Sequence, residues 1–191
     1  MRRVLVSNIA SLDGFYEGEG GDFTVLEMDG AFDAYNLERI RAADAVLLGR
    51  RSFELFSSYW PSVADAPDDP ANRAFDDVNR AISRAWNAKP KIVVSDSYVV
   101  SSGNPWAPQT TVVPRNGVGD ALVGDVVVFG SRTMWNGLLA AGLVDEVHLM
   151  LSPRAIGRGV PLFDTGVELE PVGVREFEGS RNLLVQYRVL R

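Results

Sequence analysis

Four short apolar segments, each rich in Val, Leu or Ile, recur along the first two thirds of the chain. They cover residues 4–10, 45–48, 91–94 and 126–129. Continuous rather than alternating hydrophobicity is typical of strands that are covered on both faces. We therefore expect these segments to be the central strands of one sheet.

Segments with helical periodicity separate these apolar runs. They cover residues 32–43, 52–58 and 72–86, and in the last of them large apolar side chains recur at three- and four-residue spacing. Strands that alternate with helices in this way predict a layered α/β domain with a mainly parallel sheet.

The pattern changes towards the C-terminus. Residues 146–151 and 182–190 are strand-like and are joined by loops that contain Gly and Pro. We expect these strands to be antiparallel and to complete the same sheet. Segments 65–70 and 101–105 are predicted loops that are too short to divide the chain, so residues 1–191 should form a single domain.

The composition limits the chemistry that this chain can carry out. Its 191 residues are 46% hydrophobic, which suffices for one substantial core, and they include no cysteine and one histidine. Disulfides and thiolate metal sites are excluded, and neither a histidine metal cluster nor Ser-His catalysis is expected, so we expect no metal site. Any chemistry must come from a cofactor or from carboxylates.

Charge and hydropathy narrow the range of partners. A formal net charge of −6 argues against general binding to nucleic acid, which needs a basic surface. No apolar segment approaches the roughly 20 residues needed to span a bilayer. Met1 is followed at once by a strand-like segment rather than by the apolar stretch of a secretion signal. We expect a soluble, cytoplasmic protein that binds a small molecule and no membrane.

The segment Gly49-Arg50-Arg51-Ser52 joins an apolar strand to a helix. The first N–H groups of a helix lack intrahelical partners and carry partial positive charge, and here two guanidinium groups stand beside them. This arrangement favours an anion, typically phosphate. The alternative is an ordinary strand-helix turn in which Gly49 allows a tight bend and both arginines are solvated.

A second junction of this kind follows residues 126–129, where Gly130 and Ser131 precede a helical segment that Gly142 should end. Ser131 alone reads as an ordinary helix cap. Two such junctions on neighbouring strands would instead hold one dinucleotide diphosphate, because ligands of open α/β sheets bind at the carboxyl ends of the strands. No Gly-x-Gly-x-x-Gly fingerprint follows the first strand.

Short motifs with a common order and spacing run through nearly the whole chain: Ser11-Leu12-Asp13-Gly14, Leu48-Gly49-Arg50-Arg51-Ser52, Tyr59-Trp60-Pro61, Lys91-Ile92-Val93-Val94-Ser95, Gly130-Ser131, Gly142-Leu143-Val144-Asp145-Glu146 and Pro153-Arg154-Ala155-Ile156-Gly157-Arg158-Gly159. Together they resemble the dihydrofolate reductase-like family. More closely, the chain resembles stand-alone relatives of the C-terminal reductase domain of the bifunctional riboflavin deaminase-reductase. The resemblance implies a three-layer α/β/α fold whose mixed, mainly parallel sheet ends in antiparallel strands.

The resemblance also implies NADPH as the cofactor, bound without a Rossmann motif. The residues that match the family's cofactor-binding positions are Ala10, which borders the nicotinamide, Gly49, Arg50, Arg51 and Ser52 at the phosphates, and Gly130, Ser131 and Arg132 on the diphosphate and nicotinamide side. Ser95 would lie near the 2′-phosphate, with Arg115 as a further candidate. Asp96 complicates this assignment, because a carboxylate beside Ser95 would repel that phosphate.

The family places a carboxylate that donates a proton on the helix before the phosphate-binding strand, and its spacing from Gly49 points to Asp33. Leu37 and Ile40 follow at i+4 and i+7, so Asp33 would lie on the apolar side of its helix. Desolvation there would raise its pKa. A helix-capping role is the alternative, because Asp33 lies near the helix start, and Asp29 and Glu27 are candidates if the helix begins elsewhere.

The first strand and its loop should border the substrate. Asn8 and Asp13 match positions there, and Leu37 and Trp60 are expected on the facing walls. Asp13 is a second candidate for catalysis, although Asp before Gly is also common in turns. Trp60 has packing beneath a loop as its alternative role. His148 is expected to be a strand residue and not a catalyst.

The expected activity is therefore NADPH-dependent reduction of a pyrimidine- or pterin-like heterocycle. The nearest family activity is that of 5-amino-6-(5-phosphoribosylamino)uracil reductase in riboflavin biosynthesis, with dihydrofolate reduction as an alternative. A nucleotide-binding protein that keeps the fold without turnover is a further alternative. The resemblance implies a homodimer, with the C-terminal strands as its interface. Ser131 departs from the family's second glycine, and a deaminase half is excluded because its zinc signature requires cysteine.

Overall fold

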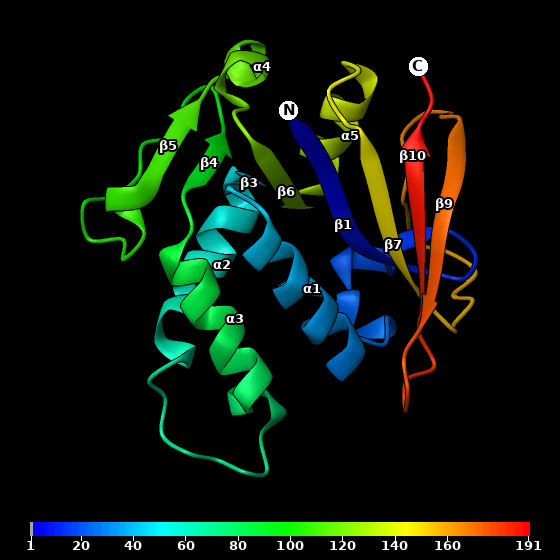
Figure 1. The fold of residues 1–191 in the computed structure, drawn as a ribbon, viewed down its shortest axis with the longest axis horizontal. Coiled ribbons are helices and arrows are strands. Elements are labelled where there is room, and N and C mark those ends of the chain that lie inside the picture. The colour runs from blue at the N-terminus through cyan, green and yellow to red at the C-terminus, as the bar shows by residue number, and fades with distance from the viewer. Residues whose placement is uncertain (1) are drawn as a thin grey trace.

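An eight-stranded sheet forms the centre of the protein, whose computed structural model describes residues 2–191 (Figure 1). Its strand order is β5-β4-β3-β6-β1-β7-β10-β9, and β2 and β8 form a separate pair. The strands are β1 (Arg3–Ser11), β2 (Phe15–Glu17), β3 (Ala45–Gly49), β4 (Lys91–Val94), β5 (Thr110–Val113), β6 (Asp125–Gly130), β7 (Glu146–Ser152), β8 (Val160–Pro161), β9 (Leu169–Glu176) and β10 (Leu183–Val189).

Strands β5, β4, β3, β6, β1 and β7 are parallel, whereas β10 and β9 are antiparallel to their neighbours. This arrangement confirms the predicted mixed sheet. The central strands are covered on both faces: all five residues of β3 and all four of β4 are buried. Their continuous hydrophobicity in the sequence therefore reflects their place in the middle of a three-layer domain.

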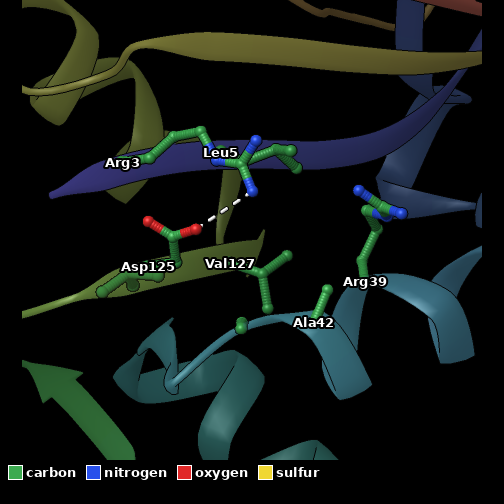
Figure 2. A pocket seen from close by; sticks show the side chains of 8 residues that line it. Arg3, Leu5, Arg39, Ala42, Asp125 and Val127 are labelled. Carbon is green, nitrogen blue, oxygen red and sulfur yellow. Dashed lines mark hydrogen bonds and ion pairs between the residues drawn. The ribbon is translucent and has the colours of Figure 1, made fainter. Parts of the chain in front are cut away.

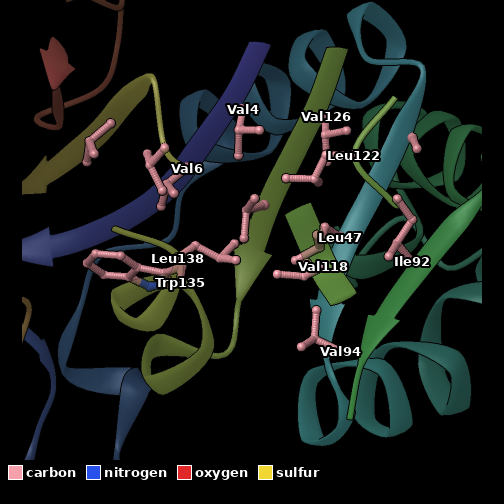
Figure 3. Close-up of a cluster of buried hydrophobic side chains, with 14 of the residues drawn as sticks. Val4, Val6, Leu47, Ile92, Val94, Val118, Leu122, Val126, Trp135 and Leu138 are labelled. Atoms are coloured by element: carbon pink, nitrogen blue, oxygen red, sulfur yellow. The ribbon is translucent and has the colours of Figure 1, made fainter. Parts of the chain in front are cut away.

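Helices cover the two faces of the sheet and complete the three-layer α/β/α fold (Figure 1). They are α1 (Gly30–Ala42), α2 (Arg50–Val63), α3 (Asp77–Ala88), α4 (Val118–Ala121) and α5 (Arg132–Ala140). The first three pack on one face, where Leu5, Val46 and Val93 join side chains of these helices. On the other face, Trp135 and Leu138 of α5 lie against Val4 and Val6 of β1 (Figure 3).

The predicted helix over residues 72–86 is divided in two. Asn72 accepts a hydrogen bond from the Ala74 N–H (3.0 Å) and starts a single 3-10 turn, η3 (Arg73–Phe75). Asp76 then accepts from the Asn79 N–H (2.8 Å) and starts α3. Two successive capping residues therefore stop one turn and begin the next, which apolar periodicity does not detect. Conversely, α2 continues to Val63, past the predicted end at residue 58.

The predicted start and end of α5 lie where the sequence indicated. Ser131 occupies the N-cap position, although its side chain makes no capping hydrogen bond. Gly142 ends the helix with φ of +66°, a conformation that glycine adopts without steric strain.

Strand β9 was not predicted. It pairs antiparallel with β10 at the edge of the sheet, and most of its residues are exposed. Pro171 and Gly173 interrupt it, and both residues are tolerated at an edge strand while weakening its signal in the sequence. Across residues 2–191, no helix combines the length and apolar character required to cross a membrane.

Lys91 is buried at the start of β4, beneath the stacked rings of Trp86 and Trp106. Its Nζ donates to the Trp86 carbonyl oxygen (2.5 Å) and lies 4.3 Å from the centroid of the Trp106 ring. Burial lowers the pKa of Lys91 to about 7. In the unfolded chain this amine keeps its ordinary pKa of 10.5 and binds a proton that the folded state releases above neutral pH.

We predict that Lys91 makes the folded state more stable as pH rises from 7 towards 10. The unfolded state then binds more protons than the folded state, so the free energy of unfolding increases with pH by about 1 kcal/mol per unit through this group. Urea denaturation of the wild type and of Lys91→Met at pH 7 and at pH 9.5 measures this increase in the free energy of unfolding. The variant should lack this increase, and parallel pH dependences of the two proteins would contradict the prediction.

Candidate functional site

The two strand-helix junctions meet at the carboxyl edge of the sheet. Strands β3 and β6 are neighbours, with Leu48 in register with Gly130, so the starts of α2 and α5 lie side by side. A Cβ atom on Gly49 would lie 2.6 Å from the Ser131 Oγ and 3.2 Å from the Ser131 N. Only glycine permits this approach of the two backbones.

Each helix N-terminus at this edge is open to an anion. Neither Gly49 nor Ser131 provides a side-chain cap, so the first N–H groups of α2 and α5 have no partner from their cap residues. The helices lie on opposite faces of the sheet and begin at the same edge. Two partial positive charges therefore converge there, which suits a diphosphate group.

Arg50 and Arg51 lie exposed in the first turn of α2, as the sequence indicated. The Arg50 Nε donates to Glu54 Oε1 (3.0 Å), and its guanidinium carbon lies 5.3 Å from the centroid of the Tyr98 ring. An exposed i,i+4 ion pair contributes only about 0.3–0.5 kcal/mol. A phosphate with two negative charges could therefore displace Glu54 from Arg50.

The hydroxyl groups of Ser52 and Tyr16 lie close to Gly130. A Cβ atom at this position would be 2.9 Å from the Ser52 Oγ and 3.6 Å from the Tyr16 hydroxyl oxygen. Ala10, at the end of β1, is fully buried in the core on the α5 side of the sheet. The absence of a side chain at Gly130 thus lets Ser52 and Tyr16 approach the end of β6.

Ser95 and Arg115 follow the carboxyl ends of β4 and β5, respectively. These are the next two strands after β3 along the same edge of the sheet. The Arg115 Nη1 donates to Asp96 Oδ2 (2.7 Å), and its backbone N–H donates to Asp96 Oδ1 (2.9 Å). The carboxylate expected to repel a phosphate is therefore paired with a cation. Ser95 Oγ accepts from the Tyr98 N–H (3.2 Å), which fixes the turn after β4.

Arg132 turns away from the junction. Its guanidinium group donates to the Pro161 carbonyl oxygen and pairs with Asp164. Asn136 reinforces the same contact, because its Nδ2 donates to the Leu162 carbonyl oxygen (3.1 Å). In this arrangement Arg132 ties the start of α5 to the segment after β8.

Asp33 is buried in the first turn of α1 and does not cap it. The N-cap is Asp29, whose Oδ1 accepts from the N–H groups of Ala31 and Phe32 (both 3.1 Å). Glu27 forms an ion pair with Arg181. Of the three acidic residues in this segment, Asp33 is therefore the one whose side chain enters the protein, where it is 9% exposed.

The carboxylate of Asp33 lies between α1 and α3. It pairs with Arg73 of η3 and accepts from the Asn79 Nδ2 (3.2 Å). The other amine of Arg73, Nη2, donates to the Met28 carbonyl oxygen (2.5 Å). Burial raises the pKa of Asp33, while Arg73 and Asn79 oppose part of that rise. Neither partner was predicted from the sequence, because a salt bridge between residues 40 positions apart leaves no local pattern.

Asp13 links two loops at the end of β1. Its Oδ1 accepts from the Ser11 hydroxyl (2.7 Å) and the Ile156 N–H (3.1 Å), and its Oδ2 accepts from the Gly157 N–H (2.7 Å). These hydrogen bonds, led by that from Ser11, lower the pKa of Asp13. An ionised carboxylate held in this way suits a structural turn better than proton donation.

Three further expected substrate residues lie at different depths. Asn8 is buried on the α5 face of β1, and its amide fits between the Phe129 carbonyl oxygen (3.2 Å) and the Trp135 Nε1 (3.3 Å). Leu37 of α1 is buried in the core beneath α1, α2 and α3. Trp60 of α2 packs partly against the same core. The structure therefore gives each of these side chains a packing role at or near the expected site.

Two cavities lie at the opposite edge of the sheet, away from the two helix N-termini. One has a volume of about 10 Å³ and lies between Arg3, Leu5, Arg39 and Asp125 (Figure 2). It has room for about one water molecule. A wider hollow of about 590 Å³ is lined by charged residues around Arg3 and Asp145, most of which form ion pairs with one another.

His148 lies inside β7 and is buried, as expected for a strand residue. Its Nδ1 contacts the Tyr35 hydroxyl, and its Nε2 lies 3.1 Å from Glu146 Oε2. Burial, with Arg39 and Arg3 adding to it, lowers the pKa of His148 to about 4. A neutral imidazole in the middle of the sheet is a structural group. The described residues also contain no cluster of three or more side chains suited to a metal ion.

Known proteins that are similar to this chain include one curated relative and two solved structures. The uncharacterized protein YyaP of Bacillus subtilis is 26% identical over 190 residues, which cover 94% of this chain and 91% of that protein. A diaminohydroxyphosphoribosylaminopyrimidine deaminase/5-amino-6-(5-phosphoribosylamino)uracil reductase from Thermotoga maritima has a TM-score of 0.64 at 18% identity, over 99% of this chain and 57% of that one. Dihydrofolate reductase from Enterococcus faecalis, solved with NADP(H), has a TM-score of 0.59 at 13% identity, over 98% and 96% of the two chains.

The two solved structures confirm the dihydrofolate reductase-like fold at low sequence identity. A family model covers most of the chain as well: that of the RibD C-terminal domain matches residues 2–115 and 119–180. The strand order and the two adjacent helix N-termini are consistent with this match. The chain belongs to the RibD C-terminal domain family.

Proposed function

We propose that this protein is an NADPH-dependent reductase of a small planar heterocycle. The meeting of two uncapped helix N-termini, those after Gly49 and Ser131, carries the proposal. Such termini favour phosphate, and ligands of open α/β sheets bind at this edge. Membership of the RibD C-terminal domain family and the fold shared with a dihydrofolate reductase solved with NADP(H) support the same cofactor.

The residues at this edge fit a dinucleotide diphosphate. Gly49 and Gly130 let the two junctions pack closely, because a Cβ atom at either position would collide with a neighbouring hydroxyl group. Arg50 and Arg51 add two exposed guanidinium groups, and Ser52 adds a hydroxyl donor. When bound, NADPH would supply the hydride, while these residues would hold its phosphates and fix its orientation.

Selection of NADPH over NADH would depend on the turn after β4. Ser95 offers a hydroxyl, and Arg115 offers a guanidinium group whose exposed side chain keeps donors free beyond its contact with Asp96. A 2′-phosphate with two negative charges would compete well for these donors. Pairing between Arg115 and Asp96 supports this choice, because it offsets the charge that would repel the phosphate.

Asp33 is the residue best suited to hold a proton for the reduced substrate. Its burial at the start of α1 raises its pKa, which favours the protonated acid. The alternative is a nucleotide-binding protein without turnover. Arg73 favours that alternative, since an ion pair with Asp33 stabilises the carboxylate and occupies one of its oxygens.

The substrate class of the proposal is a pyrimidine or a pterin. The uracil reductase of Thermotoga maritima and the dihydrofolate reductase of Enterococcus faecalis share this fold, and both are named for planar nitrogen heterocycles. The first is the nearer candidate, because the family model is that of the RibD C-terminal domain. NADPH oxidation with aminouracils and with dihydropterins would distinguish the two.

We predict that Arg50→Ala raises the Kd for NADPH and for NADH alike. Both cofactors carry the diphosphate, and loss of a charge-assisted hydrogen bond costs about 1.5 kcal/mol, or roughly tenfold in affinity. Titration of NADPH and NADH fluorescence measures the change. Arg84→Ala removes an exposed arginine from α3 and serves as the control. Unchanged affinity in folded Arg50→Ala protein would exclude Arg50 from the site.

We predict that Asp33→Asn slows NADPH oxidation by about 100-fold or more, because a proton donor is lost, while the Kd for NADPH is retained. The wild-type rate should fall as pH rises through the raised pKa of Asp33, and the variant should lack this decline. Asp29→Ala is the control: loss of the α1 cap should lower the melting temperature without abolishing turnover. Equal, measurable rates in Asp33→Asn and the wild type would exclude Asp33 as the proton donor, whereas a wild type without turnover would support the non-catalytic alternative.

We further propose that the protein is a cytoplasmic homodimer joined through the antiparallel edge of its sheet. Val172 and Val174 expose 47% and 62% of their surface on β9, and Leu190 exposes 47% just beyond β10. Val174→Glu should then shift the sedimentation coefficient to that of a monomer, because a charge cannot be buried without a partner. A monomeric wild type, or a variant that remains dimeric, would contradict this interface.

A further inference from the structure

Tyr16 brings a hydroxyl group to the junction that the two helices form. It lies on β2, just after the loop that follows β1, and its hydroxyl oxygen is 3.6 Å from the point where a Cβ on Gly130 would lie. Ser52 Oγ is 2.9 Å from the same point. Two hydroxyl groups from distant parts of the chain therefore flank one residue that has no side chain.

The hydroxyl of Tyr16 has no hydrogen-bond partner within residues 2–191, although its ring packs against the core on the α5 side. Burial raises the pKa of Tyr16, Glu17 adds to the rise, and Arg132 opposes it. The phenol is therefore protonated at neutral pH and keeps a free O–H donor. A partly buried hydroxyl without a protein acceptor is free to donate to a ligand at the junction.

The position of Tyr16 does not depend on its hydroxyl. Strand β2 pairs with β8, with Phe15 in register with Pro161, and the Leu162 N–H donates to the Gly14 carbonyl oxygen (2.9 Å). Asp13 fixes the loop on the other side through the Gly157 N–H. The backbone thus presents the hydroxyl in a defined place, which is the arrangement expected of a group that contacts a ligand.

We propose that the Tyr16 hydroxyl donates a hydrogen bond to the diphosphate of the bound dinucleotide where it passes Gly130. The inference rests on the proposed function and assigns a cofactor contact to a residue outside the motifs of the phosphate-binding junctions. Diphosphate oxygens are strong acceptors, and the two helix N-termini lie at the same point. Tyr16 and Ser52 would then hold the diphosphate from its two sides.

Tyr16→Phe tests the contact, because it removes the hydroxyl and keeps the ring. We expect the Kd for NADPH and for NADH to rise about tenfold, as for loss of a hydrogen bond to a charged group. Adenosine 2′-monophosphate lacks both phosphates of the diphosphate, so its affinity should not change. Tyr187→Phe is the matched control, since Tyr187 is also a partly buried tyrosine of the same core and lies on β10.

The outcomes separate this inference from the proposed function. Wild-type protein that binds neither NADPH nor NADH would overturn both. Wild-type protein that binds them, with Tyr16→Phe unchanged, would overturn the Tyr16 contact alone. An equal loss of affinity for NADPH and adenosine 2′-monophosphate, or a loss in Tyr187→Phe as large as in Tyr16→Phe, would indicate a general structural effect and would also overturn the Tyr16 contact.

Discussion

The close approach of Gly49 to Ser131 is the constraint on which the candidate site depends. Pairing of β3 with β6 brings the two helix starts together, and a single Cβ at Gly49 would collide with the Ser131 hydroxyl. The charge at this edge is thus a property of the backbone and of strand order. Gly130 extends the same constraint, because Ser52 lies where its side chain would be. Glycine at both positions lets the starts of the two helices approach each other closely, so their dipoles act at one point of the edge.

This edge can bind an anion although the protein has a net negative charge, because two carboxylates near the site have ion-pair or hydrogen-bond partners. Asp96 pairs with Arg115, and Asp13 accepts hydrogen bonds that include two from backbone N–H groups. Arg50 and Arg51 remain exposed beside the helix start. The net charge of −6 therefore says little about the potential at the junction, which is set within a few ångströms by these local groups.

The sequence predicted those parts of the fold that follow from local patterns. Strand β4 lies at its predicted bounds, since a strand buried on both faces is apolar throughout. Strand β9 was missed because an exposed edge has no such run. In the site, residues next to a strand end could be identified, whereas Arg73 and Tyr16 could not. Arg73 reaches Asp33 across 40 residues, and Tyr16 faces Gly130 only through strand pairing.

The pKa shifts of three groups are consistent with the proposed reductase activity. Hydrogen bonds lower the pKa of Asp13, so it is ionised and structural. Burial raises the pKa of both Asp33 and Tyr16, so each group holds its proton to a higher pH than it would in water. Arg73 acts against burial at Asp33, so the proton affinity of this carboxylate depends on the contact between η3 and α1. The proposed catalytic role of Asp33 therefore depends on this one ion pair rather than on the sheet.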